Sequence, residues 1–434
     1  MTKPAPITER RYIVPLAMVT SLFFVWAIGV NLNDVLIQHM KKAFGLSDFQ
    51  SSHIQIAFFG GYFLAAFPAG WLMQRIGYKR GILWGLVVCA TGAILFIPAA
   101  SVRVYAFFLF ALFVMACGQS VLEVAANPYA TTLGPAESSE QRLNLAQSFN
   151  ATGAFLVVLL GSRFILSGIE YTPAQQASMS PSQLLNYRIS EANMVKTPYL
   201  VITGIFLFIG ILIFFAKLPE IQASSDVGSE ELNTKLSGTL AFPHLIRGVL
   251  AQFCYVGAQV GVASFVIRLT EYTLPGTHET LAAEFLQGHA LGFMLGRFSG
   301  SAMMRKIAPN RLLSIFAAGS LLCATTIVFG WGLATVAAVV LLGFFHSIMF
   351  PTIFALSIKG LGPYTKLGSS LLVMAIVGGA LFPALMGRIS DAWNIQRAFL
   401  VPLLCHAFVL YFGMRGYRPS TSALGNAVAL PEEV

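Results

Sequence analysis

Apolar residues are grouped along the chain in long runs, and short polar segments separate one run from the next. A helix needs about 20 mostly apolar residues to cross the hydrocarbon core of a bilayer. By this criterion the first half of the chain carries six spans, near residues 13–38, 52–75, 81–100, 104–132, 143–167 and 197–217. The second half carries six more, near residues 245–270, 282–304, 311–332, 334–359, 367–390 and 396–414. The pattern therefore predicts an all-α membrane protein with 12 transmembrane helices.

Two longer polar stretches interrupt the apolar runs. Residues 168–196 separate the fifth span from the sixth, and residues 219–243 form an acidic, Ser-rich segment between the two halves of the chain. The second stretch has the composition of an interdomain linker. The predicted domains are a six-helix bundle, a cytoplasmic linker, and a second six-helix bundle with a short cytoplasmic tail, over residues 1–217, 218–243 and 244–434.

The two halves also resemble each other. Glu123 in span four is followed five residues later by Pro128. His346 in span ten is followed five residues later by Pro351. Repeated halves that are interrupted at matching positions are typical of secondary transporters, whose substrate sites lie between the repeats.

Composition supports a membrane protein and excludes several function classes. Charged residues make up 10% of the chain, whereas a soluble domain has roughly a quarter. The net charge of +9 comes from short basic clusters between apolar runs, not from a continuous basic face, so we expect no nucleic-acid partner. The excess of Lys and Arg in alternate connections places both termini in the cytoplasm of a protein of the cell inner membrane. We expect a monomer surrounded by the lipid bilayer.

Motifs for cofactor, metal or nucleotide chemistry are missing from the sequence. There is no G-x-x-x-x-G-K-[ST] loop for ATP and no H-E-x-x-H metal motif. No nucleophile–base set suggests catalysis. We therefore expect no cofactor, no metal, no catalytic residue and no enzymatic activity.

Two carboxyl groups fall within predicted spans. Asp34 lies in the outer part of span one, and Glu123 lies beyond the midpoint of span four. An ionised carboxylate within the bilayer costs at least about 2.5–3.5 kcal/mol, so such a group is usually functional and can take up a proton. The pattern predicts that the pair carries protons. The alternatives are that Asp34 meets water at the membrane edge and that Glu123 makes a structural hydrogen bond.

Neutral amides gather in spans four, five and seven. Amide groups both donate and accept hydrogen bonds, as the hydroxyls of a sugar require. An anionic substrate would instead call for Lys or Arg in the cavity, and a cationic drug for more carboxylates. Together with aromatic rings, the amides predict a sugar site. The members of this predicted site are Trp26, Asn127, Gln147, Asn150, Tyr255 and Gln259.

Two further basic side chains lie within spans. His346 can bind substrate or act as a structural hydrogen-bond donor, and the sequence leaves both interpretations open. Arg297 lies within span eight.

A Gly-rich basic segment at the cytoplasmic end of span two is a candidate gate. Gly70, Arg75, Gly77 and Arg80 combine a tight turn with cations that can hold neighbouring helix ends together. The simpler alternative is ordinary positive charge on the cytoplasmic side.

This segment resembles the signature loop of the major facilitator superfamily, with Gln74 where an Asp is usual. Other segments resemble the fucose/glucose–galactose:proton symporter family along nearly the whole chain. They are residues 31–34 (NLND), 122–128 (LEVAANP), 142–150 (RLNLAQSFN), 252–259 (QFCYVGAQ) and 351–354 (PTIF).

The resemblance implies the major facilitator fold, with two pseudo-symmetric six-helix bundles. It also implies that Asp34 and Glu123 are the protonatable pair. It further implies that the sugar cavity is lined by Trp26, Asn31, Gln147 and Asn150.

Two positions depart from the pattern of the family's fucose transporters. Ala263 stands where a Trp is expected, and Phe350 where a Tyr is expected. We therefore expect a proton-coupled symporter that imports glucose, galactose, mannose or N-acetylglucosamine by alternating access, with fucose less favoured. The alternatives are an uncoupled sugar facilitator and a drug/proton antiporter of the same fold.

Overall fold

The structure is a computed structural model that describes residues 5–44, 48–165, 175, 178–219 and 236–419. The described residues are nearly all helical, and there is no strand among them. This confirms the predicted all-α membrane fold.

The helices of the first half follow the apolar runs. They are α1 (Ile13–Phe44), α2 (Asp48–Val102), α3 (Tyr105–Thr132), α4 (Ser139–Ile165), α6 (Pro181–Met194) and α7 (Lys196–Phe215). Helix α6 begins with a capping box in which the Ser180 hydroxyl accepts from the Gln183 N–H and the Gln183 side chain accepts from the Ser180 N–H. This helix lies in a stretch predicted only as a polar interruption, because its composition has too few apolar residues to suggest a span.

The helices of the second half include several that are interrupted. They are α8 (Leu236–Leu240), α9 (Pro243–Thr273), α10 (Glu279–Met303), α11 (Pro309–Phe329), α12 (Leu333–His346), α13 (Met349–Ile358), α14 (Thr365–Met374), α15 (Gly378–Ala392) and α16 (Leu400–Tyr411).

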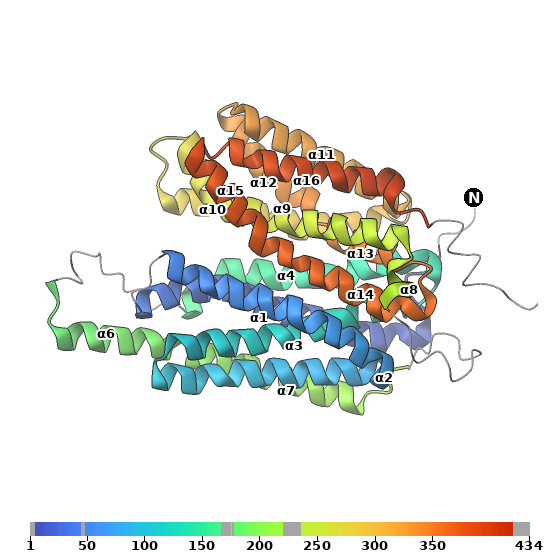
Figure 1. Cartoon of the computed structure of the whole chain (residues 1–434), viewed down its shortest axis with the longest axis horizontal. Helices are drawn as coiled ribbons and strands as arrows, with labels where there is room; N and C mark the ends of the chain where they lie inside the picture. Colours follow the sequence, from blue (N-terminus) through green and yellow to red (C-terminus); the bar gives the residue numbers. More distant parts are fainter. Residues whose placement is uncertain (1–4, 45–47, 166–174, 176–177, 220–235, 420–434) are drawn as a thin grey trace, which may run out of the picture.

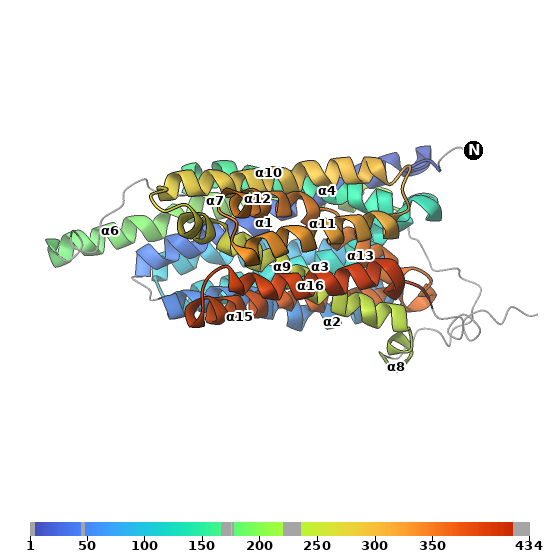
Figure 2. The same cartoon turned by 90° about the horizontal axis from the view of Figure 1, so that it is seen from above.

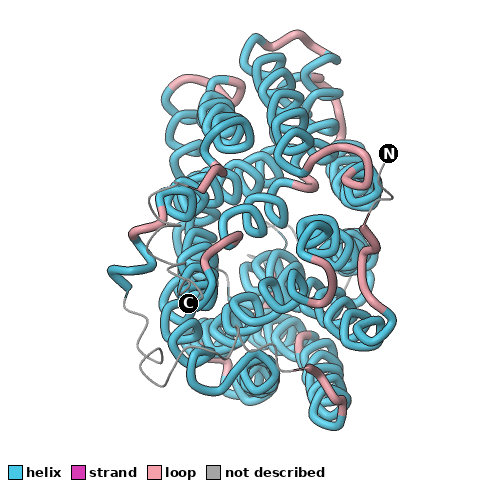
Figure 3. Tube along the Cα trace, turned by 90° about the vertical axis from the view of Figure 1, so that its right-hand side faces the viewer, coloured by secondary structure: helices cyan, strands magenta, loops and turns pink. Residues whose placement is uncertain are grey.

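The helices form two groups, which Figure 1 shows one above the other and Figure 3 shows nearly end-on. Helices α1 to α7 lie in one group and α9 to α16 in the other. The N-terminus lies at one end of both groups, and α6 projects from the opposite end (Figures 1 and 2). The N-terminal segment is held at its end because the Thr8 hydroxyl donates to the Leu133 carbonyl, over 2.7 Å.

Helix α2 accounts for two predicted spans. Its helical geometry is interrupted at Gly77, where φ is +76°, a value that glycine adopts without the steric cost that a Cβ imposes. Gly61 and Gly92, at similar distances along the chain on either side of Gly77, both contact α3 near Met115 and Ala116. The chain therefore folds back at Gly77, and both arms of α2 pack on α3.

Predicted span ten is broken into α12 and α13. Pro351 lies in the first turn of α13 and has no N–H to donate to the Ser347 carbonyl, four residues earlier. The Ser347 carbonyl is left without that helical hydrogen bond. The matching Pro128 in span four lies inside the continuous helix α3, so the predicted interruption at matching positions occurs only in the second half.

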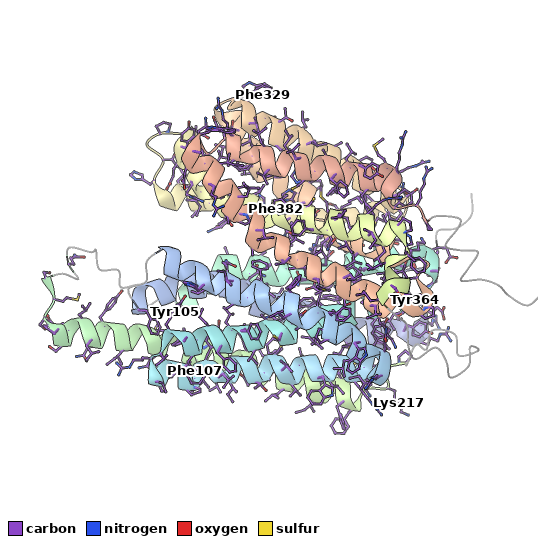
Figure 4. All side chains as sticks on the ribbon, viewed as in Figure 1. Tyr105, Phe107, Lys217, Phe329, Tyr364 and Phe382 are labelled. Carbon is purple, nitrogen blue, oxygen red and sulfur yellow. The ribbon has the colours of Figure 1, made fainter. Side chains whose placement is uncertain are left out.

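Among the described residues, nine helical segments are long and apolar enough to cross a membrane. One of them contains both arms of α2, and the more polar helices α4 and α10 bring the number to the twelve predicted. Large apolar side chains cover the outer surface (Figure 4), where Phe215, Leu322 and Leu404 are at least 70% exposed. Large exposed apolar side chains over the outer surface are typical of a surface that faces lipid.

The close contact between α2 and α3 predicts that adding a side chain at Gly92 lowers the stability of the protein. A Cβ at Gly92 would lie 2.3 Å from the Met115 backbone nitrogen, so Gly92→Ala forces the two helices apart. Overpacking of this kind costs about 1–3 kcal/mol, and we expect a lower melting temperature in detergent. Gly204→Ala on α7 is the matched control, since no atom lies within 4 Å of its Cβ. Equal melting temperatures for the two variants would contradict the close packing.

Candidate functional site

A cavity of about 240 Å³ lies between the two groups of helices. Helices α1, α2, α3 and α4 line one side, and α9, α10 and α13 line the other. The polar lining residues are Trp26, Asn31, Tyr62, Glu123, Gln147, Asn150, Gln259 and Arg297. The apolar lining includes Phe58, Phe59, Phe293, Phe350 and Val256.

The structure brings most of the predicted sugar residues to this cavity. Trp26, Asn31, Gln147, Asn150 and Gln259 line it, as does Glu123. The cavity therefore joins predicted residues from α1, α3, α4 and α9, which are far apart in the sequence. The side chain of Asp34, on α1, lies outside the described residues.

Two predicted sugar residues lie behind the cavity wall. Asn127 is fully buried, and its Oδ1 accepts from Gln147 Nε2 over 2.9 Å. Tyr255 is fully buried, and its hydroxyl donates to the His346 carbonyl over 2.9 Å. Neither residue lines the cavity, and Asn127 supports the lining residue Gln147.

His346 also lies behind the wall of the cavity. Its side chain is fully buried, and its Nε2 lies 2.8 Å from Nε2 of His406. At that distance one ring donates and the other accepts, so the two imidazoles form a hydrogen-bonded pair inside the second group of helices. In the described conformation His346 therefore makes a structural hydrogen bond and does not line the cavity.

Trp26 presents an aromatic surface to the cavity. Its indole N–H donates to the Tyr62 hydroxyl over 3.2 Å, and its ring stacks on Phe23 with 5.5 Å between centroids. The indole is 3% exposed, so these two contacts fix its orientation. Tyr62 was not predicted from the sequence, because it lies in span two, outside the spans in which the amides gather.

Glu123 is the acidic group of the cavity. It projects from α3, is 5% exposed, and lies near enough to Arg297 for the two charges to interact. The sequence indicated Arg297 within span eight but did not connect it with Glu123. An Arg within an apolar span is costly to insert, and that cost was the signal that could have identified this residue.

Arg297 reaches from α10 across the cavity to α4. Its Nε donates to the Ser347 carbonyl over 2.9 Å, and its Nη1 donates to Gln147 Oε1 over 2.9 Å. Nη1 also lies 3.5 Å from Asn150 Oδ1, and the guanidinium lies over the Phe293 ring at 4.6 Å from its centroid. The Ser347 carbonyl is available because Pro351 cannot donate to it.

Comparison with known proteins shows the family to which the chain belongs. Residues 18–369 match the family model of the Major Facilitator Superfamily. The chain belongs to this superfamily. It is 42% identical to the L-fucose-proton symporter of Escherichia coli (strain K12) over 408 residues, which are 93% of each chain. It is 41% identical to the glucose/galactose transporter of Brucella abortus biovar 1 (strain 9-941), over 94% of this chain and 95% of the relative.

These relatives place the chain within the fucose/glucose–galactose:proton symporter family of the superfamily, whose members are transporters and not enzymes. A crystal structure of a Major Facilitator Superfamily transporter in the outward conformation matches with a TM-score of 0.86 at 41% identity. The match covers 94% of this chain and 99% of that one.

In this superfamily member, the two bundles are joined at the end where the N-terminus lies. Lys359 Nζ lies 2.8 Å from a Glu140 carboxylate oxygen, and Glu140 is 2% exposed. Gln141 Nε2 donates to the Ser301 carbonyl over 3.0 Å. Further along α4, Asn144 Nδ2 donates to the Thr352 hydroxyl over 3.1 Å. Polar side chains at the start of α4 therefore close this end of the cavity.

The signature loop adds a close contact between the bundles. A Cβ at Gly70 would lie 2.7 Å from the Cβ of Ser370 on α14, so α2 and α14 meet there backbone to side chain. The Arg75 guanidinium stacks over Trp71 at 3.9 Å from the ring centroid, on an exposed surface. Arg80 is also exposed. The structure thus joins the bundles through Gly70, while the loop itself turns at Gly77.

The two positions that depart from the fucose transporters differ in placement. Phe350 lines the cavity, whereas Ala263 does not. Only the departure at Phe350 therefore changes a residue that lines the cavity directly.

The Glu140–Lys359 ion pair predicts that reversing the charge at position 140 separates the two bundles at their joined end. Cysteines at Gln141 and Ser301 should cross-link readily with a short bifunctional methanethiosulfonate reagent, because the parent residues are in hydrogen-bond contact. Glu140→Lys should lower the cross-linking rate several-fold, since like charges then face each other. The double variant Glu140→Lys/Lys359→Glu should recover most of the rate. A failure of the second change to restore the rate would show that the ion pair does not hold this end closed.

Proposed function

We propose that the protein is a proton-coupled symporter that moves a small neutral hexose across the membrane by alternating access. The observation that carries this proposal is one cavity, between two helix bundles, that contains a buried carboxyl group beside an indole ring and several amides. The named functions of the relatives, an L-fucose-proton symporter and a glucose/galactose transporter, support the same conclusion.

The sugar binds to the lining of the cavity. Trp26 supplies a flat apolar surface for one face of the ring, as aromatic residues do in ligand sites. Asn31 and Gln259 supply amide groups for the hydroxyls, together with Gln147 and Asn150. Asn127 acts from behind the wall by fixing Gln147 in position, and Tyr255 and His346 lie further behind, joined by the bond from the Tyr255 hydroxyl to the His346 carbonyl.

Protons are carried by Glu123 and Asp34. Glu123 shares the cavity with the substrate, so its protonation state changes the charge that the sugar meets. A protonated carboxyl leaves the Arg297 charge without its counterion, whereas an ionised one balances it. Sugar binding and proton binding are thereby coupled at one site. Asp34 is the second carrier, nearer the outer end of α1.

The conformation described here faces outward. With the termini in the cytoplasm, the closed end lies on the cytoplasmic side, and Figure 1 shows the two bundles separating toward the other end. Transport requires that the contacts at the start of α4 and at Gly70 break while the outer ends approach each other. The loop residues Gly70, Arg75, Gly77 and Arg80 take part in this movement. The protein works as a monomer in the inner membrane.

The substrate is a hexose such as glucose, galactose, mannose, N-acetylglucosamine or fucose. Fucose belongs to this group because it is the named substrate of a relative at 42% identity. Phe350 lines the cavity with an apolar ring and is therefore a candidate for discrimination among these sugars.

Removal of the proton carrier in the cavity is the first test of this function. Glu123→Gln keeps the size of the side chain but cannot release a proton. We expect loss of proton-driven accumulation of radiolabelled sugar in proteoliposomes, with sugar exchange across the membrane retained. Glu137→Gln, at an exposed position, is the control and should behave as the parent protein. A Glu123→Gln variant that still concentrates sugar would show that another group couples the protons.

A panel of sugars is the second test. Glucose, galactose, mannose, N-acetylglucosamine and fucose would be added in turn to proteoliposomes while the external pH is recorded. We expect at least one sugar to cause alkalinisation outside as protons enter with it. Sugar entry without proton movement would identify an uncoupled facilitator. Proton movement with cationic drugs but with none of the sugars would identify an antiporter.

A further inference from the structure

Arg297 is a cavity-lining side chain that forms hydrogen bonds with both bundles. It is 4% exposed and contacts both sides at once. In its own bundle it holds the Ser347 carbonyl, and in the other bundle its Nη1 donates to both the carbonyl and the side-chain oxygen of Gln147. Hydrogen bonds from an ionised donor are about twice as strong as neutral ones. The bonds from Arg297 to Gln147 are therefore a substantial part of the contact between the bundles at the level of the cavity.

The amides that Arg297 reaches are already engaged by protein groups. Gln147 Oε1 accepts from Arg297, and its Nε2 donates to Asn127. Asn150 Oδ1 lies 3.5 Å from Arg297 Nη1, and its Nδ2 donates to the Phe23 carbonyl over 3.2 Å. Gln147 is only 3% exposed, so a ligand cannot reach its oxygen while the guanidinium stays in place.

A ligand hydroxyl and the guanidinium therefore compete for the same amide oxygens. The bonds from Arg297 to α4 exist only while the two bundles are close at this level. A ligand that binds these oxygens in place of Arg297 removes a contact that favours the present conformation. The equilibrium then shifts toward the other conformation by the free energy of the contact that is lost.

We propose that Arg297 is a positioning residue that links substrate binding to bundle movement: its bonds to Gln147 and Asn150 hold the present conformation, and the sugar releases them by binding the same two amides. The identity of the ligand as a sugar rests on the function proposed above. The cross-bundle role of Arg297 rests on its contacts alone.

The test measures the distance between the bundles at their joined end. Spin labels are attached to Glu137→Cys and Lys306→Cys, two exposed positions on opposite bundles, in the full chain with its five native cysteines replaced by alanine. Distances are recorded by double electron–electron resonance in lipid nanodiscs, without sugar and with saturating D-galactose, D-glucose or L-fucose. The variants are Arg297→Gln and Arg297→Lys. Arg268→Gln is the matched control, because that guanidinium stacks over Phe265 within its own bundle.

Without sugar, we expect Arg297→Gln to raise the long-distance population at least threefold over the parent, and the Arg268→Gln control to leave it unchanged. Addition of sugar should raise that population in the parent and change it less than half as much in Arg297→Gln. Arg297→Lys should give an intermediate result, because an ammonium keeps the charge but cannot reach Ser347 and α4 together.

A sugar-free distribution that is the same in Arg297→Gln and the parent would overturn the proposal, as would an undiminished response to sugar. If Arg297→Gln fails to fold, as judged by its melting curve, Arg297→Lys decides the question by the same criteria. If none of the five sugars of the panel proposed above, mannose and N-acetylglucosamine included, binds to the parent protein, the proposed function is wrong, and the sugar-free comparison still tests the cross-bundle role.

Discussion

A polar group inside a bilayer has no water to bind, so it must find its partner within the protein. The backbone meets this requirement by forming helices, which satisfy its N–H and C=O groups internally. The side chains meet it by gathering between the two bundles, where Glu123, Arg297 and Gln147 share one cavity. The same constraint gives the molecule its apolar outer shell and its polar interior surface. The site thus forms where the polar side chains inside the bilayer find hydrogen-bond partners within the protein.

A broken helix illustrates how local chemistry and site geometry are connected. Pro351 cannot donate to the Ser347 carbonyl, and the chain interrupts its helix there. The carbonyl then becomes an acceptor for Arg297 Nε, which fixes the guanidinium in the cavity. One missing N–H in α13 therefore determines where the positive charge on α10 is held.

The number and order of the spans could be predicted from the sequence, because an apolar run long enough to cross a bilayer is rare outside membrane helices. Most of the amides and the indole that line the cavity could also be predicted, since such groups within apolar runs are unusual. Lining residues could not be separated from those one layer behind, because Gln147 and Asn127 carry the same chemistry and differ only in position. His346 was ambiguous for the same reason, as its partner His406 lies on another helix and is not recognisable as a neighbour from the sequence. Arg297 was overlooked because the prediction relied on groups of amides and gave no weight to a lone cation.

The contacts of α4 with the second bundle run along a single face of that helix. They begin at Glu140, continue at Asn144 and end at Gln147 and Asn150, at the spacing of successive helical turns. At a rise of about 1.5 Å per residue, this row is about 15 Å long. Such a row can open from one end, so that the contacts are lost one after another. The neutral hydrogen bond at Asn144 contributes about 1 kcal/mol net and the bonds to charged groups about 1.5–3 kcal/mol each, and a sequential opening does not have to overcome their sum in one step. For a row that opens in this way, the barrier to movement is set by the contacts broken at each step rather than by the total strength of the row.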